Sequence, residues 1–236
     1  MDKRRKEILH CAIKDFIESG EYITSRKIYE SYDFGIKPAM IRRELNALDN
    51  SGYLDQVHTS SGRYPTNKAY KDFVEELVDK IEKCESENKN IEELVNIDFR
   101  KSKDDILEHL ANSLADYLNV LSACYEPEKE RLYNRGLRKL CANLSVDDKK
   151  HLNEILKDFE LMKDRIRSRE NWWKKEREWP QYFIGPSPVT ESDLLAVLAH
   201  KISFPDSDIV IITVGPKAMD YKKSINALRN LEKTLQ

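Results

Sequence analysis

A short polar hairpin between two amphipathic helices is the feature that most limits how this chain can fold. The run "SGYLDQV" ends in the alternation of apolar and polar residues that is typical of a short strand, and "TSSG" then supplies a turn at Ser61 and Gly62. "RYPT" indicates a return strand, whose pairing Pro65 limits, and Thr66 is a candidate N-cap for the next helix. A hairpin placed directly after a helix-turn-helix predicts a winged helix.

Three short helices are expected before this hairpin. Apolar residues recur at helical spacing, and Thr24 or Ser25 can cap the second helix. Pro38 suits the first turn of a third helix over residues 37–51, which Gly52 closes. The tight connection between the second and third helices predicts a helix-turn-helix. We expect the apolar side chains of the third helix to face the core, namely Met40, Ile41, Leu45 and Leu48.

Charge is unevenly distributed along the chain. The net charge is −2, yet residues 1–71 hold 13 Lys and Arg against 10 Asp and Glu. A cationic excess in this region would favour phosphates, and the second helix of a helix-turn-helix enters the major groove. Arginine can read guanine, asparagine can read adenine, and both can hold phosphates. The candidate DNA contacts are Ser25, Lys37, Pro38, Ala39, Arg42, Arg43, Asn46, His58, Thr59, Ser60, Arg63 and Tyr64.

Each candidate also has an ordinary structural interpretation. The two arginines of the third helix could be solvated or paired to Glu44 and Asp49. His58 could satisfy the backbone of the turn, and Arg63 could pack along the next tyrosine or pair with Asp55. A winged helix can also be a protein-interaction or ligand-sensing module that does not bind DNA, so the fold alone leaves both functions open.

The second half of the chain predicts an α+β domain. The runs "QYFIGPSP", "LLAVLAHKIS" and "DIVIITVGP" are apolar and bounded by Pro, Gly and Asp, which indicates strands, and "NVLSACY" and "ERLYNRG" are shorter candidates. Helical spacing recurs in "KSKDDILEHLANSLADYL", in "SVDDKKHLNEILKDFELMKDRI" with Ser145 as its cap, and in "MDYKKSINALRNLEKTLQ". We therefore expect one sheet with helices packed on it.

The segment "NWWKKEREW" has two interpretations. Its tryptophans, Trp172, Trp173 and Trp179, could form an exposed patch with the neighbouring cations and bind a partner or a second stretch of DNA. The interpretation that we favour is that the tryptophans cap the sheet while the basic residues face solvent.

The sequence predicts a protein that is not an enzyme and has no cofactor or metal. The four cysteines are too dispersed for a metal site or a disulfide framework, and reduced thiols fit a cytoplasmic location. No phosphate-binding glycine loop or nucleophile elbow occurs in the sequence, and His200 is better explained as a partly buried structural residue. The charged N-terminus and the short apolar runs predict a soluble protein.

Two separated blocks of this sequence resemble the HrcA family of heat-inducible transcription repressors. The first is "SGYLDQVHTSSGRYPTNKAY" and the second is "VGPKAMDYKKSINAL". The recognition-helix pattern "IRRELNALDNSGYL" occurs in many bacterial regulators, so the hairpin block is the more specific of the two N-terminal signals. The matching positions are Gly52, Tyr53, Leu54, His58, Thr59, Ser60, Gly62, Arg63, Pro65, Thr66, Tyr70, Gly215, Pro216, Met219, Asp220 and Tyr221.

The resemblance implies a dimeric repressor whose winged helices bind an inverted repeat upstream of chaperone operons. It implies a winged-helix domain over residues 1–78, a helical linker over 79–100 and a GAF-like α+β domain over 101–236 that dimerises or senses the chaperonin. This chain departs from the family pattern in one respect, because it looks short for a family whose GAF-like domain usually carries an inserted dimerising subdomain.

Overall fold

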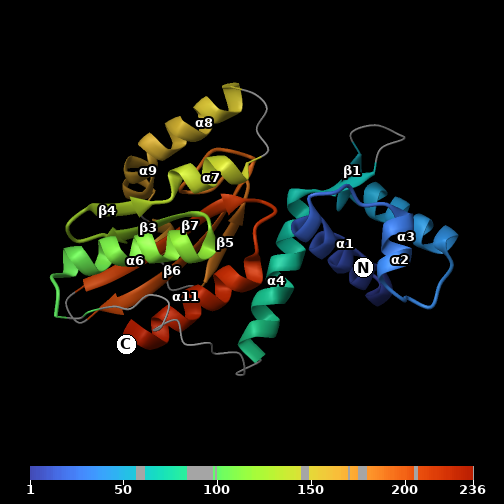
Figure 1. Cartoon of the computed structure of the whole chain (residues 1–236), viewed down its shortest axis with the longest axis horizontal. Helices are drawn as coiled ribbons and strands as arrows, with labels where there is room; N and C mark the ends of the chain where they lie inside the picture. Colours follow the sequence, from blue (N-terminus) through green and yellow to red (C-terminus); the bar gives the residue numbers. More distant parts are fainter. Residues whose placement is uncertain are drawn as a thin grey trace. The chain divides into compact units, whose positions relative to one another are not determined.

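The chain divides into two compact units, Met1–Leu77 and Val78–Gln236, in a computed structural model of the protein (Figure 1). The structure describes residues 1–56, 62–83, 98, 100–144, 149–169, 171–174, 180–204 and 207–235. The predicted turn at Ser61, the cap at Ser145 and Trp179 lie outside these ranges.

The first unit consists of three helices, a two-stranded hairpin and the start of a fourth helix. The elements are α1 (Lys3–Ser19), α2 (Ser25–Ser31), α3 (Pro38–Asn50), β1 (Leu54–Gln56), β2 (Arg63–Pro65) and α4 (Asn67–Lys83). α1 ends where Gly20 adopts a left-handed conformation at φ 69°. Thr24 caps α2, since its side chain accepts a hydrogen bond from the Lys27 amide at 3.2 Å. Pro38 occupies the first turn of α3, as the sequence predicts.

The helices enclose a small apolar core. Ile41, Leu45 and Leu48 of α3 are fully buried, as expected from their spacing. The prediction for Met40 is wrong, because its side chain is 37% exposed. Met40 lies one residue, or about 100° of helix, from Ile41 and therefore falls outside the buried stripe. The core is completed by Ile8, Leu9, Ile13, Ile28, Leu54, Tyr70 and Val74.

The hairpin is attached to the segment between α1 and α2. β1 and β2 pair antiparallel, and Arg63 exchanges two backbone hydrogen bonds with Ile23, at 2.7 and 2.9 Å. Gly62 lies so close to this segment that an added Cβ would be 2.6 Å from the Tyr22 Cβ and 2.9 Å from the Ile23 carbonyl oxygen. Position 62 therefore requires a glycine, because the hairpin and the Tyr22–Ile23 segment approach each other too closely for a side chain.

The second unit is an α+β domain, as the sequence predicts. Its five-stranded antiparallel sheet has the order β4-β3-β7-β6-β5. The strands are β3 (Leu121–Glu126), β4 (Arg131–Arg135), β5 (Gln181–Ile184), β6 (Leu195–Phe204) and β7 (Ser207–Pro216). The helices are α6 (Lys103–Leu118), α7 (Leu137–Asn143), α8 (Lys149–Glu160), α9 (Met162–Ser168), α10 (Asn171–Lys174) and α11 (Tyr221–Leu235).

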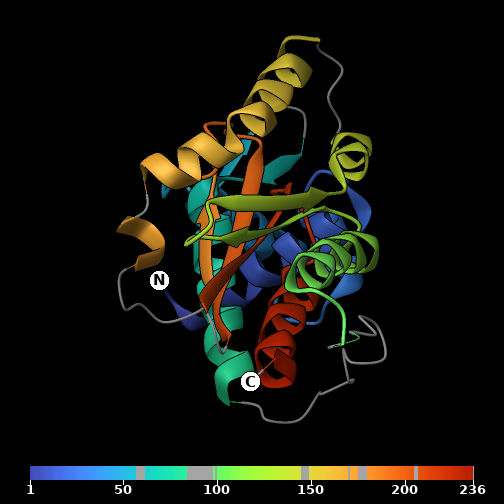
Figure 2. The same ribbon diagram turned by 90° about the vertical axis from the view of Figure 1, so that its left-hand side faces the viewer.

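Helices cover both faces of this sheet (Figures 1 and 2). α6 and α11 lie on one face, where Lys103 of α6 pairs with buried Glu126 and Glu232 of α11 lies 3.0 Å from His200. Helices α7 to α10 pack their apolar side chains into the other face. His200, 1% exposed, is thus a buried residue of the sheet–helix interface.

Two tryptophans belong to the core of this second face. Trp172 and Trp173 are 6% and 7% exposed. Their rings make edge contacts with Phe183 at 5.8 Å and Tyr125 at 6.2 Å between centroids. These two residues therefore cap the sheet and do not form an exposed aromatic patch.

Among the described residues, no helix has the length and apolar content needed to cross a bilayer. Nor do the described Asp, Glu, His and Cys side chains gather in a group of three or more that could hold a metal ion.

Candidate nucleic-acid interface

The outward side of α3 carries most of the predicted contacts. Lys37 is the N-cap of α3 and is exposed, as are Pro38 and Ala39 in the first turn. Arg42, Arg43 and Asn46 follow on the exposed side, opposite the buried stripe. The helix therefore presents a continuous polar surface that begins at its N-terminal turn.

The two acids of α3 that could neutralise this surface, Glu44 and Asp49, pair with other residues. Glu44 accepts from Arg5 Nε at 2.7 Å, and Asp49 accepts from Arg63 Nε at 2.6 Å. Neither Arg42 nor Arg43 forms an ion pair with any of the described residues; Arg43 Nη1 lies 3.9 Å from the sulfur of Met40. The alternative in which Glu44 and Asp49 pair with these two arginines is therefore wrong.

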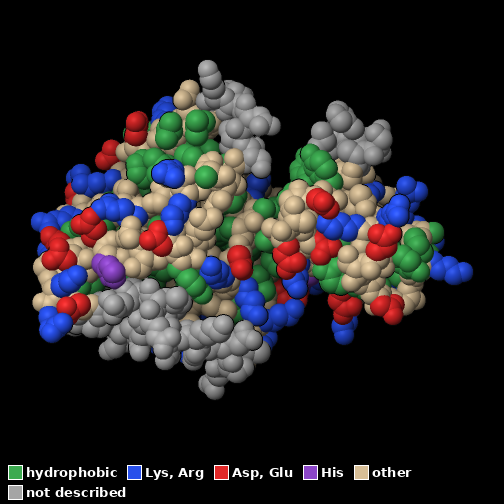
Figure 3. All heavy atoms as spheres, in the orientation of Figure 1, with side chains coloured by type: hydrophobic (Ala, Val, Ile, Leu, Met, Phe, Trp, Pro, Cys, Tyr) green, Lys and Arg blue, Asp and Glu red, His purple; other side chains and the backbone are tan. Residues whose placement is uncertain are grey.

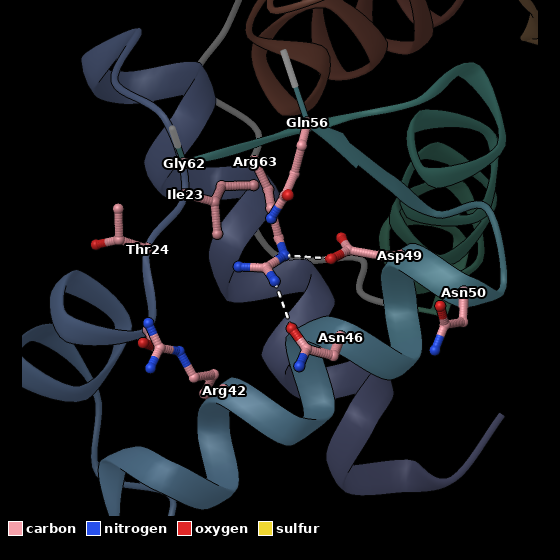
Figure 4. Close-up of a pocket in the computed structure, with 10 residues that line it drawn as sticks. Ile23, Thr24, Arg42, Asn46, Asp49, Asn50, Gln56, Gly62 and Arg63 are labelled. Atoms are coloured by element: carbon pink, nitrogen blue, oxygen red, sulfur yellow. Dashed lines mark hydrogen bonds and ion pairs between the residues drawn. The ribbon is translucent and has the colours of Figure 1, made fainter. Parts of the chain in front are cut away.

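Arg63 joins the hairpin to α3. Its Nη2 donates to Asn46 Oδ1 at 2.5 Å, in addition to the bond from Nε to Asp49, and its side chain is only 11% exposed (Figure 4). Asn46 and Asp49 are three residues apart on α3, which puts them on one side of the helix and within reach of one guanidinium. Arg63 thus has a structural partner, although it is Asp49 and not the predicted Asp55.

Asp55 is occupied by its cross-strand neighbour. Tyr64 stands opposite Asp55 in the hairpin, and its hydroxyl donates to Asp55 Oδ2 at 3.1 Å. Burial and this hydrogen bond raise the pKa of the Tyr64 phenol above its usual value. Tyr64 is half-buried, and it can present a neutral hydroxyl to a ligand at the base of the hairpin.

A polar hollow of about 550 Å³ lies where the hairpin, α3 and the start of α2 meet (Figure 4). Arg42, Asn46 and Arg63 line it, together with Ser25 at the beginning of α2. Asp49 is the acid in this lining, and Arg63 already neutralises it. The hollow is therefore a hydrogen-bonding surface with one free cation, Arg42, among its described lining residues. On the face shown in Figure 3, acidic and basic side chains are interspersed.

The structure brings four of the predicted residues together in the lining of this hollow, namely Ser25, Arg42, Asn46 and Arg63. Lys37, Pro38, Ala39 and Arg43 are exposed on α3 but do not belong to this lining, and Tyr64 lies opposite Asp55 in the hairpin. His58, Thr59 and Ser60 lie outside the described residues. Sequence reasoning missed Thr24, Asn50 and Gln56, which also line the hollow. The spacing of Asn46 and Asn50, four residues apart on α3, could have indicated the last turn of this surface.

Comparison with known proteins identifies the family. The family model described as "HrcA protein C terminal domain" matches residues 71–225, well over half of the chain. A heat-inducible transcription repressor HrcA of Clostridium botulinum (strain Eklund 17B / Type B) is 30% identical over 166 residues, covering 70% of this chain and 47% of the relative. That of Clostridium tetani (strain Massachusetts / E88) is 44% identical over 86 residues, covering 36% of this chain and 24% of the relative.

One solved structure shares the fold along the whole length. It is described as "Crystal structure of a hypothetical protein at 2.2 A resolution" and matches with a TM-score of 0.77 and 16% identity, over 100% of this chain and 97% of that one. At this identity the likeness concerns the fold alone. The chain spans about half the length of the curated relatives it matches. Because the family model covers residues 71–225 and a relative is 30% identical over 70% of this chain, the chain belongs to the HrcA family.

Proposed function

We propose that the first unit is a winged helix that binds double-stranded DNA. In this proposal α3 enters the major groove, with Arg42 and Asn46 toward the base edges, and the β1–β2 hairpin is the wing. One observation carries the proposal. Arg42 and Arg43 stand exposed on α3 without an acidic partner among the described residues, while Arg63 fixes the hairpin to that same helix. The remaining predicted contacts, His58 to Ser60 among them, belong to this proposal as further DNA contacts.

The regulatory role follows from the family. The curated relatives are named heat-inducible transcription repressors, which is the name of a regulator and not of an enzyme. On this basis the chain represses heat-shock genes in the cytoplasm by binding an inverted repeat upstream of a chaperone operon. An inverted repeat requires two copies of the reading helix, so the active species is a homodimer.

The second unit supplies dimerisation and sensing in this proposal. Its antiparallel sheet with helices on both faces supports assignment as a reduced GAF-like domain over residues 101–236. The helical linker expected over residues 79–100 lies for the most part outside the described residues. The division of the chain at Leu77 and Val78 supports a winged-helix domain that ends near residue 78. The chaperonin is the partner that this domain would sense.

A titration with the full chain tests DNA binding. Fluorescence anisotropy compares a duplex that carries an inverted repeat from upstream of a chaperone operon with a scrambled duplex of equal composition, at several salt concentrations. We expect selective binding of the repeat, with log K falling against log salt by about 0.9 for each phosphate neutralised. Equal affinity for both duplexes would overturn the repressor assignment. Absence of binding at micromolar protein would favour the protein-interaction module.

Light scattering on the same samples tests the dimer. Two chains per duplex are expected, because each half-site takes one reading helix. A single chain per duplex at saturation would exclude recognition of an inverted repeat.

A further inference from the structure

The amide of Asn46 has a fixed orientation. Arg63 Nη2 donates to Asn46 Oδ1 at 2.5 Å. A guanidinium carries donors only, so the oxygen of Asn46 and not its NH2 group must face Arg63. Figure 4 shows the amide nitrogen of Asn46 on the side away from Arg63.

Arg63 itself is held from two directions. Its Nε donates to Asp49 Oδ2 at 2.6 Å, and its backbone exchanges hydrogen bonds with Ile23 at 2.7 and 2.9 Å. Its side chain is largely removed from solvent. These contacts hold the guanidinium beside Asn46 and keep the Asn46 oxygen turned toward the hairpin.

This arrangement changes what Asn46 can recognise. An asparagine that reads adenine accepts from the N6 amino group and donates to N7, so it needs both halves of its amide. In Asn46 the accepting half is engaged by Arg63, and the donating half faces outward. In the major groove guanine presents two neighbouring acceptors, N7 and O6, and no donor.

We propose that Arg63 is a positioning residue that sets the outward polarity of Asn46, so that Asn46 reads guanine and not adenine. This specificity rests on the proposed DNA-binding function and goes beyond it, because it names the base and the side chain that select it. It also gives the hairpin arginine a role in specificity without a contact to DNA.

Selection from a duplex library tests the inference. The full chain is presented with the inverted repeat in which each half-site position is randomised in turn, and the retained duplexes are sequenced. The wild-type chain is expected to enrich guanine at one half-site position, by roughly fivefold or more over adenine. Asn46→Ala should remove the preference at that position and leave the other positions unchanged.

Two further variants separate positioning from a merely structural role. Asn46→Asp keeps the size of the side chain, leaves one oxygen on Arg63 and turns an acceptor outward, so the preference should change from guanine to cytosine, whose N4 group is a donor. Arg63→Met removes the donors and releases the Asn46 oxygen, so adenine should gain at the same position. Thermal unfolding of each variant verifies that it is folded under the selection conditions.

The outcomes distinguish this inference from the proposed function. If the wild-type chain enriches no sequence, DNA-binding specificity fails and the inference fails with it. If the wild-type chain enriches a sequence but the position sensitive to Asn46→Ala is adenine, the inference alone is overturned. It is also overturned if Asn46→Asp leaves the base preference unchanged.

Discussion

Arg63 Nε donates to Asp49 Oδ2 at 2.6 Å and so fastens β2 to α3 across 14 residues of sequence. The side chains are 11% and 24% exposed, which puts the pair between a surface ion pair and a buried one. We expect a double-mutant cycle with Arg63→Ala and Asp49→Ala to give a coupling of about 1–3 kcal/mol in urea unfolding.

A matched pair on α2 serves as the control for this cycle. Arg26 and Glu30 form an ion pair at 2.8 Å, but their side chains are 86% and 59% exposed. Solvent screens a pair this exposed, so its coupling should be much smaller than that of Arg63 and Asp49. Similar couplings for the two pairs would mean that Arg63 does not fasten the hairpin to α3.

Gly62→Ala should destabilise the first unit. The added Cβ would lie 2.6 Å from the Tyr22 Cβ and 2.9 Å from the Ile23 carbonyl oxygen, which are both parts of the chain that cannot rotate away. The hairpin would have to move off the segment before α2, at a cost of about 1–3 kcal/mol. Thermal unfolding measures the loss, and an unchanged midpoint would show that the hairpin moves freely relative to Ile23.

Much of the fold could be predicted from local signals in the sequence. Helical spacing placed the third helix at residues 37–51, and it is observed at Pro38–Asn50. Apolar runs bounded by Pro, Gly and Asp placed the strands observed as β5, β6 and β7. These signals succeed because periodicity and caps act within a few residues of one another.

The partners of the site could not be predicted, because they depend on tertiary placement. The choice of Asp49 over Asp55 for Arg63 is made when the hairpin folds back on α3, and Tyr64 then takes Asp55. The requirement for glycine at position 62 likewise comes from the Tyr22–Ile23 segment, about 40 residues earlier in the chain. Neither relationship leaves a periodic signal in the sequence.

Met40 and Leu45 should respond very differently to truncation. Met40 is 37% exposed on the outward side of α3, whereas Leu45 is fully buried. Met40→Ala should change the free energy of unfolding by no more than about 0.5 kcal/mol, and Leu45→Ala should reduce it by about 2–5 kcal/mol. Urea unfolding measures the free energy of unfolding of both variants. A loss for Met40→Ala as large as that for Leu45→Ala would mean that Met40 packs in the core.

Arg42→Ala should weaken binding mainly at the cognate repeat. Arg42 is exposed on α3 and lines the hollow, and an arginine in the major groove discriminates bases by about 1–3 kcal/mol. Lys14→Ala is the control, because Lys14 is an exposed cation of α1 that pairs with Glu18. Anisotropy titrations with the repeat and the scrambled duplex should show a selective loss for Arg42→Ala and little change for Lys14→Ala. Equal losses on both duplexes would make Arg42 a phosphate contact.

The buried His200 should make the second unit less stable in weak acid. Burial lowers the pKa of His200; Glu232 of α11, 3.0 Å away, opposes this effect, and Arg229 of the same helix adds to it. Because the pKa in the folded state lies below the value of about 6.5 in the unfolded chain, the unfolded chain takes up its proton first as the pH falls. As the pH falls below about 6.5, the free energy of unfolding therefore decreases, by at most about 1.4 kcal/mol per pH unit for this one group, until the folded state is protonated too.

Urea unfolding between pH 7.5 and pH 5, a range of about 2.5 units around that pKa, measures how steeply the free energy of unfolding changes with pH in the wild type and in His200→Gln. His109→Gln, which changes an exposed histidine of α6, is the control. The slope should be smaller in His200→Gln alone, and an equal reduction in His109→Gln would assign the effect to histidine charge in general rather than to burial at the α11 interface.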